Sequence, residues 1–135
     1  MSTQEIKDAV PAMPPQSVPA LRTLAMPADA NPNGDIFGGW IVSQMDLAGL
    51  RMAQSRSKSR VTTVAIEGLA FLNPVHVGDS VCCYAELVEV GKTSMKIQIE
   101  TWALIPIVEE RRQVTSAVFS FVAINEEGKP QRIDR

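Results

Sequence analysis

The chain has 135 residues, enough for one domain with a real but small core. Hydrophobic residues make up 45% and charged residues 21%, as is ordinary for a soluble globular protein. The net charge of −2 argues mildly against nucleic acid as the main partner, and the apolar runs are too short to span a bilayer. No basic-then-apolar leader opens the sequence, so we expect a cytoplasmic protein. The adjacent Cys82 and Cys83 would point to opposite faces of a strand, which argues against a disulfide between them.

The first elements in chain order are an irregular arm, a short strand and a long helix. Residues 1–16 contain three prolines with little periodic pattern, and we interpret them as a mobile arm. Residues 21–26, LRTLAM, predict a short strand that ends at Pro27. From Ile36 to about Gln54 the apolar residues point nearly all the way round a helix, which is typical of a helix buried inside other structure.

After the helix the hydrophobic period changes to that of strands. Residues 55–60, SRSKSR, are polar and basic and predict a loop. The segment 91–93 is short enough for a hairpin, and residues 106–113 break the strand pattern. Four segments have the pattern of strands: 61–72, 80–90, 95–103 and 114–124. We therefore expect one domain over residues 17–130 and a C-terminal tail at 131–135.

This order of elements predicts an α+β fold. A single helix that is hydrophobic all round needs a sheet curled around it, and the four later strands would supply that sheet in antiparallel succession. A curved antiparallel β-sheet wrapped around one long central helix is the hotdog arrangement. One sheet cannot cover a helix of this length completely, so we expect a partner subunit.

The stretch that opens the helix contains an unusual number of turn residues and glycines. Asn33, Gly34 and Asp35 predict a tight turn with positive φ at its centre. Gly38 and Gly39 follow in the first helical turn, where each costs roughly 1 kcal/mol of helix propensity. That cost makes sense if something must approach the backbone there.

Asp46 is unexpected in a buried helix. Arg51 lies about 140° round the helix from it, so no intrahelical ion pair compensates its charge. A buried carboxylate without a partner is costly, and catalytic sites are where such groups are usually found. The alternative is an acid that serves the structure alone and is capped by hydrogen bonds.

Three motifs, NGDIFGGWIVSQMD, FLNPVHVGD and GKTS, resemble those of the short bacterial acyl-CoA thioesterases of the hotdog superfamily, the YciA-like group. The resemblance covers about residues 20–130. It implies hydrolysis of acyl-CoA to free CoA and a carboxylic acid, without a metal and without any cofactor beyond the CoA of the substrate. In related thioesterases the helix acid is general base or nucleophile, and the backbone at the glycine pair polarises the thioester carbonyl. Carried over, these are Asp46 and Gly39.

Helix geometry supports these two roles and adds a constraint. A helix N-terminus offers unpaired N–H groups and a partial positive charge to a developing oxyanion. Asp46 lies seven residues beyond Gly39, about 10 Å along the same helix, too far to attack a carbonyl held there. We therefore expect an obligate homodimer in which one subunit supplies the N-terminus and the other the carboxylate. The family often assembles further, into trimers of dimers.

Other candidate residues have two possible roles each. Asp35 is either a catalytic helper or the N-cap of the helix, because some relatives have an asparagine there that positions water. In the thioesterases the hairpin at 91–94 lies near the nucleotide end of CoA, so it is either a plain hairpin or a contact for phosphate and pantetheine. Arg60 belongs either to a solvated linker or to an anion site. The predicted CoA-binding residues are Asn33, Gly38, Arg60, Gly91, Lys92 and Ser94.

Two other functions compete with hydrolysis. A non-catalytic acyl-CoA-binding protein of the same fold would keep the acid for structure alone. A hotdog dehydratase would need a histidine in the substrate cleft, and the only histidine, His76, lies in a predicted loop as a surface residue. Steady release of free thiol from an acyl-CoA distinguishes a hydrolase from a binding protein.

Overall fold

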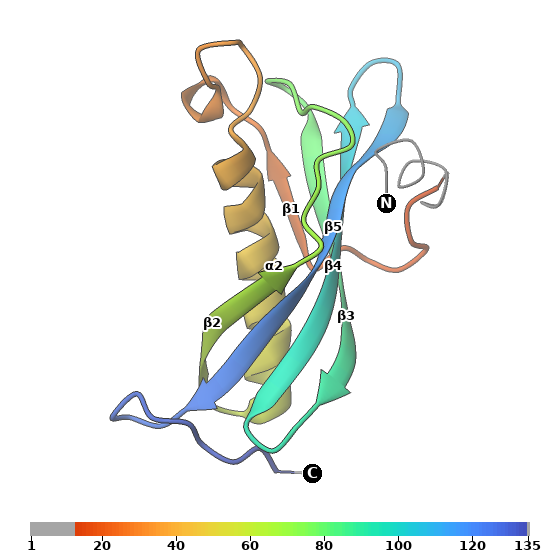
Figure 1. The fold of residues 1–135 in the computed structure, drawn as a ribbon. Coiled ribbons are helices and arrows are strands. Elements are labelled where there is room, and N and C mark those ends of the chain that lie inside the picture. Colours follow the sequence, from red (N-terminus) through yellow and green to blue (C-terminus); the bar gives the residue numbers. More distant parts are fainter. Residues whose placement is uncertain (1–12, 135) are drawn as a thin grey trace.

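The computed structural model describes residues 13–134, so most of the predicted N-terminal arm, residues 1–12, lies outside it. One strand and one 3₁₀ helix precede the long helix, and four strands follow it (Figure 1). In chain order the elements are β1 (Leu21–Leu24), η1 (Pro27–Asp29), α2 (Gly38–Ser57), β2 (Arg60–Glu67), β3 (Ser80–Val90), β4 (Ser94–Ile105) and β5 (Glu110–Ile124). Within the described range no helix is long and apolar enough to cross a membrane.

The strands form one antiparallel sheet in the order β1-β3-β4-β5-β2. The sheet curls around α2, which lies against its inner face (Figure 1). The predicted antiparallel succession holds for β3, β4 and β5, but it is wrong for β2, which pairs with β5 rather than with β3. Because α2 carries the chain across the sheet from β1 at one edge, β2 joins the opposite edge.

The helix is longer at its C-terminal end than the sequence predicted. Ser55–Ser57, the first half of the predicted loop 55–60, form its last turn. Lys58 ends the helix in the left-handed conformation, with a φ of +56°, and only Lys58 and Ser59 separate α2 from β2. The loop prediction is therefore wrong for most of this segment. Polar and basic residues favour a loop by composition, but they also suit a last helical turn: cations complement the helix dipole, and the hydroxyl of the buried Ser57 donates to the Ala53 carbonyl oxygen (2.9 Å).

Two strand boundaries differ from the prediction because of backbone turns. β2 stops at Glu67, well before the predicted residue 72, since Gly68 takes a positive φ of +77°. β5 starts at Glu110 rather than at residue 114, because a turn at 106–109 is enough to connect it to β4. The bounds of β3 agree with the prediction residue for residue.

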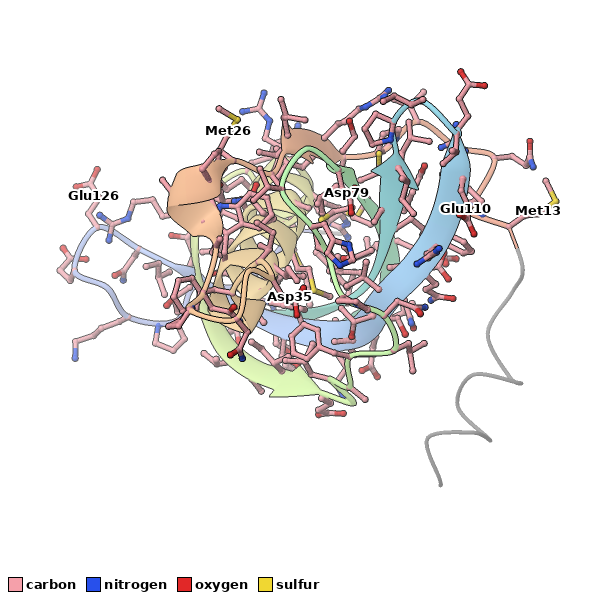
Figure 2. All side chains as sticks on the ribbon, turned by 90° about the horizontal axis from the view of Figure 1, so that it is seen from above. Met13, Met26, Asp35, Asp79, Glu110 and Glu126 are labelled. Atoms are coloured by element: carbon pink, nitrogen blue, oxygen red, sulfur yellow. The ribbon has the colours of Figure 1, made fainter. Side chains whose placement is uncertain are left out.

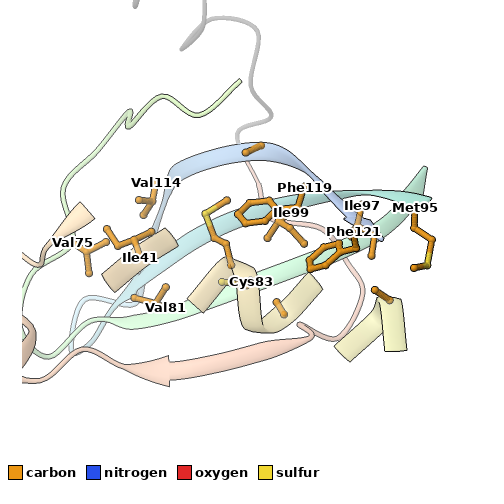
Figure 3. Close-up of a cluster of buried hydrophobic side chains, with 14 of the residues drawn as sticks. Ile41, Val75, Val81, Cys83, Met95, Ile97, Ile99, Val114, Phe119 and Phe121 are labelled. Carbon is orange, nitrogen blue, oxygen red and sulfur yellow. The ribbon is translucent and has the colours of Figure 1, made fainter. Parts of the chain in front are cut away.

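The core lies between α2 and the inner face of the sheet (Figure 3). Its largest fully buried side chains include Phe119, Phe121, Met45, Met95, Ile97 and Ile99. Gly49 is required at the contact between helix and sheet, because a Cβ there would lie 2.8 Å from the Phe121 ring. The helix propensity lost at this glycine, roughly 1 kcal/mol, is offset by the close packing of an aromatic ring on the helix backbone.

One side of α2 is not covered by the sheet. Leu47 keeps 51% of its surface exposed, and the edge strand β2 exposes Val64 and Ile66. The sequence predicted a helix that is hydrophobic all round and a partner subunit to cover what one sheet cannot. These exposed apolar side chains, on the open side of α2 and on the adjacent edge strand β2, are a surface that a partner subunit would cover.

The last described residues fold back onto the sheet. Ile133 is buried in the core, and its N–H donates to the Lys92 carbonyl oxygen over 2.8 Å. The Gln131 N–H donates in the same way to the Ala123 carbonyl oxygen. Residues 131–134 of the predicted tail thus pack at the end of the sheet where the β3–β4 hairpin lies, and the predicted domain boundaries stay a prediction.

Candidate active site

The chain enters α2 through a turn that Asn31 holds together. Its Oδ1 accepts hydrogen bonds from the N–H groups of Asn33 (2.9 Å) and Asp35 (3.1 Å), and Gly34 adopts the predicted positive φ, +88°. Asn33, a predicted CoA contact, is exposed, and its N–H closes this turn. Asn31, which no sequence motif had marked, also lines a cavity beside the helix. The signal that could have found it is the tendency of asparagine to bond the backbone two residues on.

The helix begins without a side-chain cap. Its N-cap residue is Phe37, which makes no side-chain hydrogen bond, so the prediction of Asp35 as the N-cap is wrong. Asp35 instead pairs through its backbone with His76 in an antiparallel bridge. The first N–H groups of a helix have no partner inside the helix, so those at Gly38 and Gly39 are available to a ligand or to water.

The two glycines at the helix start have different surroundings. A Cβ on Gly38 would lie 3.3 Å from the Phe71 ring, which is tighter than ordinary packing. A Cβ on Gly39 would meet no atom within 4 Å. Gly38 therefore allows the close approach of Phe71 within the chain, whereas only a ligand or a partner molecule would require a glycine at position 39.

A cavity of about 340 Å³ lies beside the start of α2. The helix side contributes Asp35, Ile36, Gly38 and Ile41 to its lining, and the loop after β2 contributes residues 71–75. The volume falls in the range of small-molecule sites, roughly 300–1,000 Å³, and most of the lining is apolar. Two of the predicted site residues, Asp35 and Gly38, therefore belong to a site that could hold an apolar ligand.

Asp46 is partly buried in the middle of α2 and has a hydrogen-bond partner. Thr63 Oγ1, on β2, donates to Asp46 Oδ1 over 2.5 Å. The prediction of a carboxylate without a partner is wrong because the partner comes from a strand rather than from the helix. A charge-assisted hydrogen bond of this kind fixes the orientation of the carboxylate. No sequence signal relates Thr63 to Asp46, because the contact depends on how β2 lies against the helix.

His76 lies between two carboxylates at the same end of the molecule. Its Nε2 is 3.4 Å from Asp35 Oδ1, and its Nδ1 is 3.9 Å from Asp79 Oδ2. The buried Asp79 carboxylate also accepts a hydrogen bond from the backbone N–H of His76 (3.0 Å). Figure 2 looks down on this end and shows both acids near the middle of the molecule. The His76 side chain is 54% exposed, which agrees with the predicted surface histidine.

The predicted CoA hairpin lies at the opposite end of α2. Figure 1 shows the β3–β4 connection there, beside the last turn of the helix and the C-terminus. The Gly91 N–H donates to the Ser94 carbonyl oxygen over 2.7 Å, which closes the hairpin, and the Lys92 side chain is exposed. The hairpin therefore presents an ammonium group to solvent at this end.

Arg60 lies at the same end as the hairpin. A guanidinium N–H of Arg60 donates to the Asn125 carbonyl oxygen (3.0 Å), and Arg60 and Lys58 both line a cavity of about 190 Å³. A helix of 20 residues is about 30 Å long. One chain therefore does not bring these predicted CoA contacts to Gly38 and Gly39.

The described residues offer little support for metal or thiol chemistry. Among residues 13–134 no group of three or more His, Cys, Asp and Glu side chains comes together as metal ligands do. Cys82 and Cys83 are both buried and free, in agreement with the argument against a disulfide. Burial raises the pKa of Cys83 to about 11 and also raises the pKa of Cys82. Thiols held neutral in this way are poor nucleophiles, so Asp46 is the stronger candidate.

The sequence matches known proteins over most of its length. Residues 33–108 match the family model described as Thioesterase superfamily. The chain is 52% identical over 122 residues to the acyl-CoA thioester hydrolase YciA of Escherichia coli (strain K12), and the match covers 88% of this chain and 92% of YciA. The chain belongs to the thioesterase superfamily.

Two solved structures of thioesterases share its fold. A hexameric hotdog fold thioesterase of Campylobacter jejuni is 40% identical, with a TM-score of 0.82 over 87% of this chain and 91% of that one. A hexameric broad specificity acyl-coenzyme A thioesterase, solved as a variant with one aspartate changed to alanine, is 48% identical. Its TM-score is 0.83 over 89% of this chain and 88% of that one. The predicted family, the hotdog fold and the predicted kind of enzyme, an acyl-CoA thioester hydrolase, are confirmed.

The thioesterase match includes every residue with a predicted site role, from Asn33 to Ser94, and also Thr63. The match ends before β5 and before the C-terminal residues. Two residues that contact the predicted CoA-binding residues therefore lie outside it: Asn125, which accepts a hydrogen bond from Arg60, and Ile133, which donates one to Lys92. The match therefore assigns the superfamily without deciding which of these residues act.

Proposed function

We propose that the chain hydrolyses acyl-CoA thioesters, with Asp46 as general base or nucleophile and the N–H groups at Gly39 as the site of the carbonyl oxygen. The observation that carries this proposal is the Asp46 carboxylate, which Thr63 orients on a helix whose start is open at Gly39. Two relatives support the reaction class, since one is an acyl-CoA thioester hydrolase and another a broad specificity acyl-coenzyme A thioesterase. The proposal needs no metal or cofactor, because CoA is part of the substrate. A cytoplasmic location stays a prediction.

Each group has a separate task in the reaction. The N–H groups of the helix start stabilise the negative charge on the carbonyl oxygen as the tetrahedral intermediate forms. Asp46 either takes a proton from the attacking water or attacks the carbonyl carbon itself. In both routes the C–S bond breaks, and CoA leaves as a thiolate that takes up a proton. When water attacks, the acyl group leaves directly as a carboxylic acid. When Asp46 attacks, a mixed anhydride between Asp46 and the acyl group forms first, and a water molecule then hydrolyses it to release the acid and restore the Asp46 carboxylate. The Thr63 hydroxyl keeps the carboxylate in one orientation, so less freedom is lost on reaching the transition state.

The N–H groups and the carboxylate of one site come from different subunits in this proposal. Asp46 lies about 10 Å along α2 from Gly39 of its own chain, beyond reach of a carbonyl held there. The open edge of β2 and the exposed Leu47, Val64 and Ile66 offer a surface on which a second copy would pack. The proposed unit is a two-fold homodimer in which each site joins the start of one helix to the Asp46 of the other. The two thioesterases of known structure are hexamers, which supports three such dimers in the full assembly.

Antiparallel helices in this dimer would direct the CoA phosphates to the basic end of the chain that supplies Asp46. That helix continues ten residues beyond Asp46 to Arg56, about 15 Å. An extended pantetheine arm is about as long as five extended residues, roughly 17 Å. Lys58, Arg60 and Lys92 lie at this end, so they become phosphate contacts, with Ser94 in the adjacent hairpin.

The test measures release of free thiol from acyl-CoA by the wild type and by Asp46→Asn. The amide keeps the size of the side chain and removes the base, so kcat should fall by about 10²–10⁴ while the fold persists. Asp29→Asn is a matched control, because the Asp29 carboxylate accepts the Met26 N–H (3.1 Å), a role that an amide oxygen can fill. Wild-type turnover by Asp46→Asn would refute the role of this acid. A wild type that binds acyl-CoA and releases no thiol would be a binding protein instead.

Mixed dimers test the shared site. Chains with Asp46→Asn and chains with Gly39→Val, each inactive alone, are combined under conditions that exchange subunits. A mixed dimer then has one site with both lesions and one with neither. Random pairing makes half of the dimers mixed, so activity should recover to roughly a quarter of the wild-type value if the sites act independently. Zero recovery, with exchange confirmed by mass spectrometry, would contradict a shared site.

A further inference from the structure

The loop that forms one wall of the 340 Å³ cavity is fixed to β5 at three points. Two of the contacts use the backbone of the loop, and the third uses the Asn73 side chain. They are Leu72 N–H to the Val114 carbonyl oxygen (2.8 Å), Thr115 Oγ1 to the Ala70 carbonyl oxygen (2.7 Å) and Asn73 Nδ2 to the Gln113 carbonyl oxygen (2.8 Å). A wall held in this way keeps its shape when a ligand enters, so the cavity is preformed.

Phe71 contributes an aromatic ring to this cavity and, together with Pro74, the exposed apolar part of its lining. Ile36, Ile41, Leu72 and Val75 each expose 8% of their surface or less, whereas Phe71 exposes 46%. The Phe71 ring lies against the helix backbone, where a Cβ at position 38 would be 3.3 Å from the ring. Phe71 thus lies where the cavity meets the surface, beside the N–H groups of the helix start.

We propose that this cavity holds the acyl chain of the substrate and that Phe71, packed on Gly38, limits the length of that chain. The inference rests on the proposed function, which places the thioester carbonyl at Gly39, next to a residue of the cavity lining. An aliphatic chain suits the lining because it needs no hydrogen-bond partner and gains from the burial of each methylene. The CoA phosphates do not suit it, because the Asp35 carboxylate lines the cavity.

The size of the cavity favours acyl chains of short to medium length. Its volume of about 340 Å³ lies at the lower end of the range of small-molecule sites, roughly 300–1,000 Å³. A longer chain would extend past the buried Ile36, Ile41, Leu72 and Val75 and meet the Phe71 ring, where the cavity reaches the surface. Removal of the ring should therefore admit longer chains, and a larger ring should exclude chains that the wild type accepts.

The experiment measures kcat/KM for straight-chain acyl-CoAs from acetyl to palmitoyl. Phe71→Ala and Phe71→Leu should raise the ratio of kcat/KM for long chains to that for butyryl-CoA by about tenfold or more, because pocket contacts discriminate strongly by chain size. Phe71→Trp should lower the same ratio by a similar factor. Variants that keep the wild-type ratio within about twofold would overturn the inference.

A binding measurement separates this inference from the proposed function. The dissociation constant of each acyl-CoA is measured by calorimetry on Asp46→Asn protein, with and without the Phe71 substitutions. A chain-length dependence of the dissociation constant that changes with residue 71 supports the acyl cavity even if the wild type hydrolyses nothing. An unchanged dependence overturns it even if hydrolysis is rapid.

Phe37→Ala is the matched control. Phe37 is 47% exposed, nearly the same as Phe71, and it adjoins Gly38 in sequence without lining the cavity. Its removal should leave the shape of the chain-length profile unchanged, whatever it does to the overall rate. A shift equal to that of Phe71→Ala would show that loss of any exposed ring near the helix start changes the profile, and would overturn the assignment to Phe71. Thermal unfolding of each variant verifies that it is folded.

Discussion

The two ends of helix α2 differ in the charged residues beside them, although the acidic Glu126 lines the same small cavity as Lys58 and Arg60 at the C-terminal end. At its start, Asp35 lines an apolar cavity, and His76 joins it to the buried Asp79. At its end lie the basic residues Arg56, Lys58, Arg60 and Lys92. Acids near the helix start and basic residues near its end both complement the helix dipole, so these charges also stabilise the helix.

This difference suits a substrate such as acyl-CoA, which has an apolar acyl chain at one end and anionic phosphates at the other. A helix start alone would attract an anion. Here acids lie near that start, so the CoA phosphates are attracted more strongly to the basic residues at the other end. The start is left for a neutral carbonyl and its aliphatic chain. The comparison therefore assigns chemistry to one end and recognition of phosphate to the other, and one experiment at each end can break or sharpen that division.

Gly39→Val should give the largest effect, at the acidic end. A side chain there would crowd the carbonyl oxygen, and loss of one oxyanion donor typically lowers kcat by about 10²–10³. Folding should be preserved, because a Cβ at Gly39 meets no atom within 4 Å and valine is no worse than glycine in a helix. Steady-state kinetics and thermal unfolding check both points, with Gly39→Ala as a milder variant. A rise in KM with an unchanged kcat would break the comparison, because the helix start would then only bind.

The pH at which the two ends are compared matters because the core contains a thiol with a raised pKa. Burial raises the pKa of Cys83 from 9.0 to about 11. Between these values the unfolded chain has lost a proton that the native chain still holds, so stability falls as pH rises. The full loss is on the order of 2–3 kcal/mol and is absent below pH 9.

Cys83→Ser tests this loss, since a serine hydroxyl does not ionise in that range. Urea unfolding at pH 8 and above pH 10 should show a smaller alkaline loss for Cys83→Ser than for Cys82→Ser, the matched control. Equal losses in the two variants would contradict the assignment to Cys83. Kinetic comparison of the two helix ends belongs below pH 9.

Lys92→Ala should give the smallest effect, at the basic end. Removal of one exposed charge is worth little, so KM for acyl-CoA should rise by about two- to fivefold with kcat unchanged, and less at high salt. Lys96→Ala is the control, because Lys96 lies on β4 beside Glu89 (3.9 Å), away from the hairpin tip. The effect should disappear for an acyl-pantetheine substrate, which lacks the nucleotide. An equal rise in KM with that substrate would place the phosphates elsewhere.

The type and bounds of an element could be predicted where the hydrophobic pattern lies within one continuous segment. The strand pattern between the turn at 78–79 and the link at 91–93 located both ends of β3, and the long apolar run located the start of α2 to within two residues. The pairing of β2 with β5 could not be predicted, because periodicity states which face of a strand is buried and not which strand lies beside it. The last turn of α2 was missed because composition alone does not distinguish a polar helix end from a loop.

The site was predictable only where the motif was local. Asp46 and the glycine pair were recognisable because their neighbours in sequence make them unusual. Thr63 and Phe71 were not, since each is an ordinary residue of its segment and gains its role from a contact with the helix. Asp35 was assigned a possible cap that Phe37 occupies instead, because the helix starts two residues later than the pattern predicted.

The two-residue connection between α2 and β2 also has a consequence for how the protein folds. It places Asp46 and Thr63 only 17 residues apart, so bringing them together closes a short loop at a small entropic cost. The pairing of β2 with β5 joins residues about 60 positions apart, from Arg60 with Ile124 to Glu67 with Val118, and must close a much longer loop. We expect the helix–β2 unit to form early and the sheet edge to close late. Substitutions at Ser59 would then change the folding rate, and substitutions along the β2–β5 ladder mainly the unfolding rate.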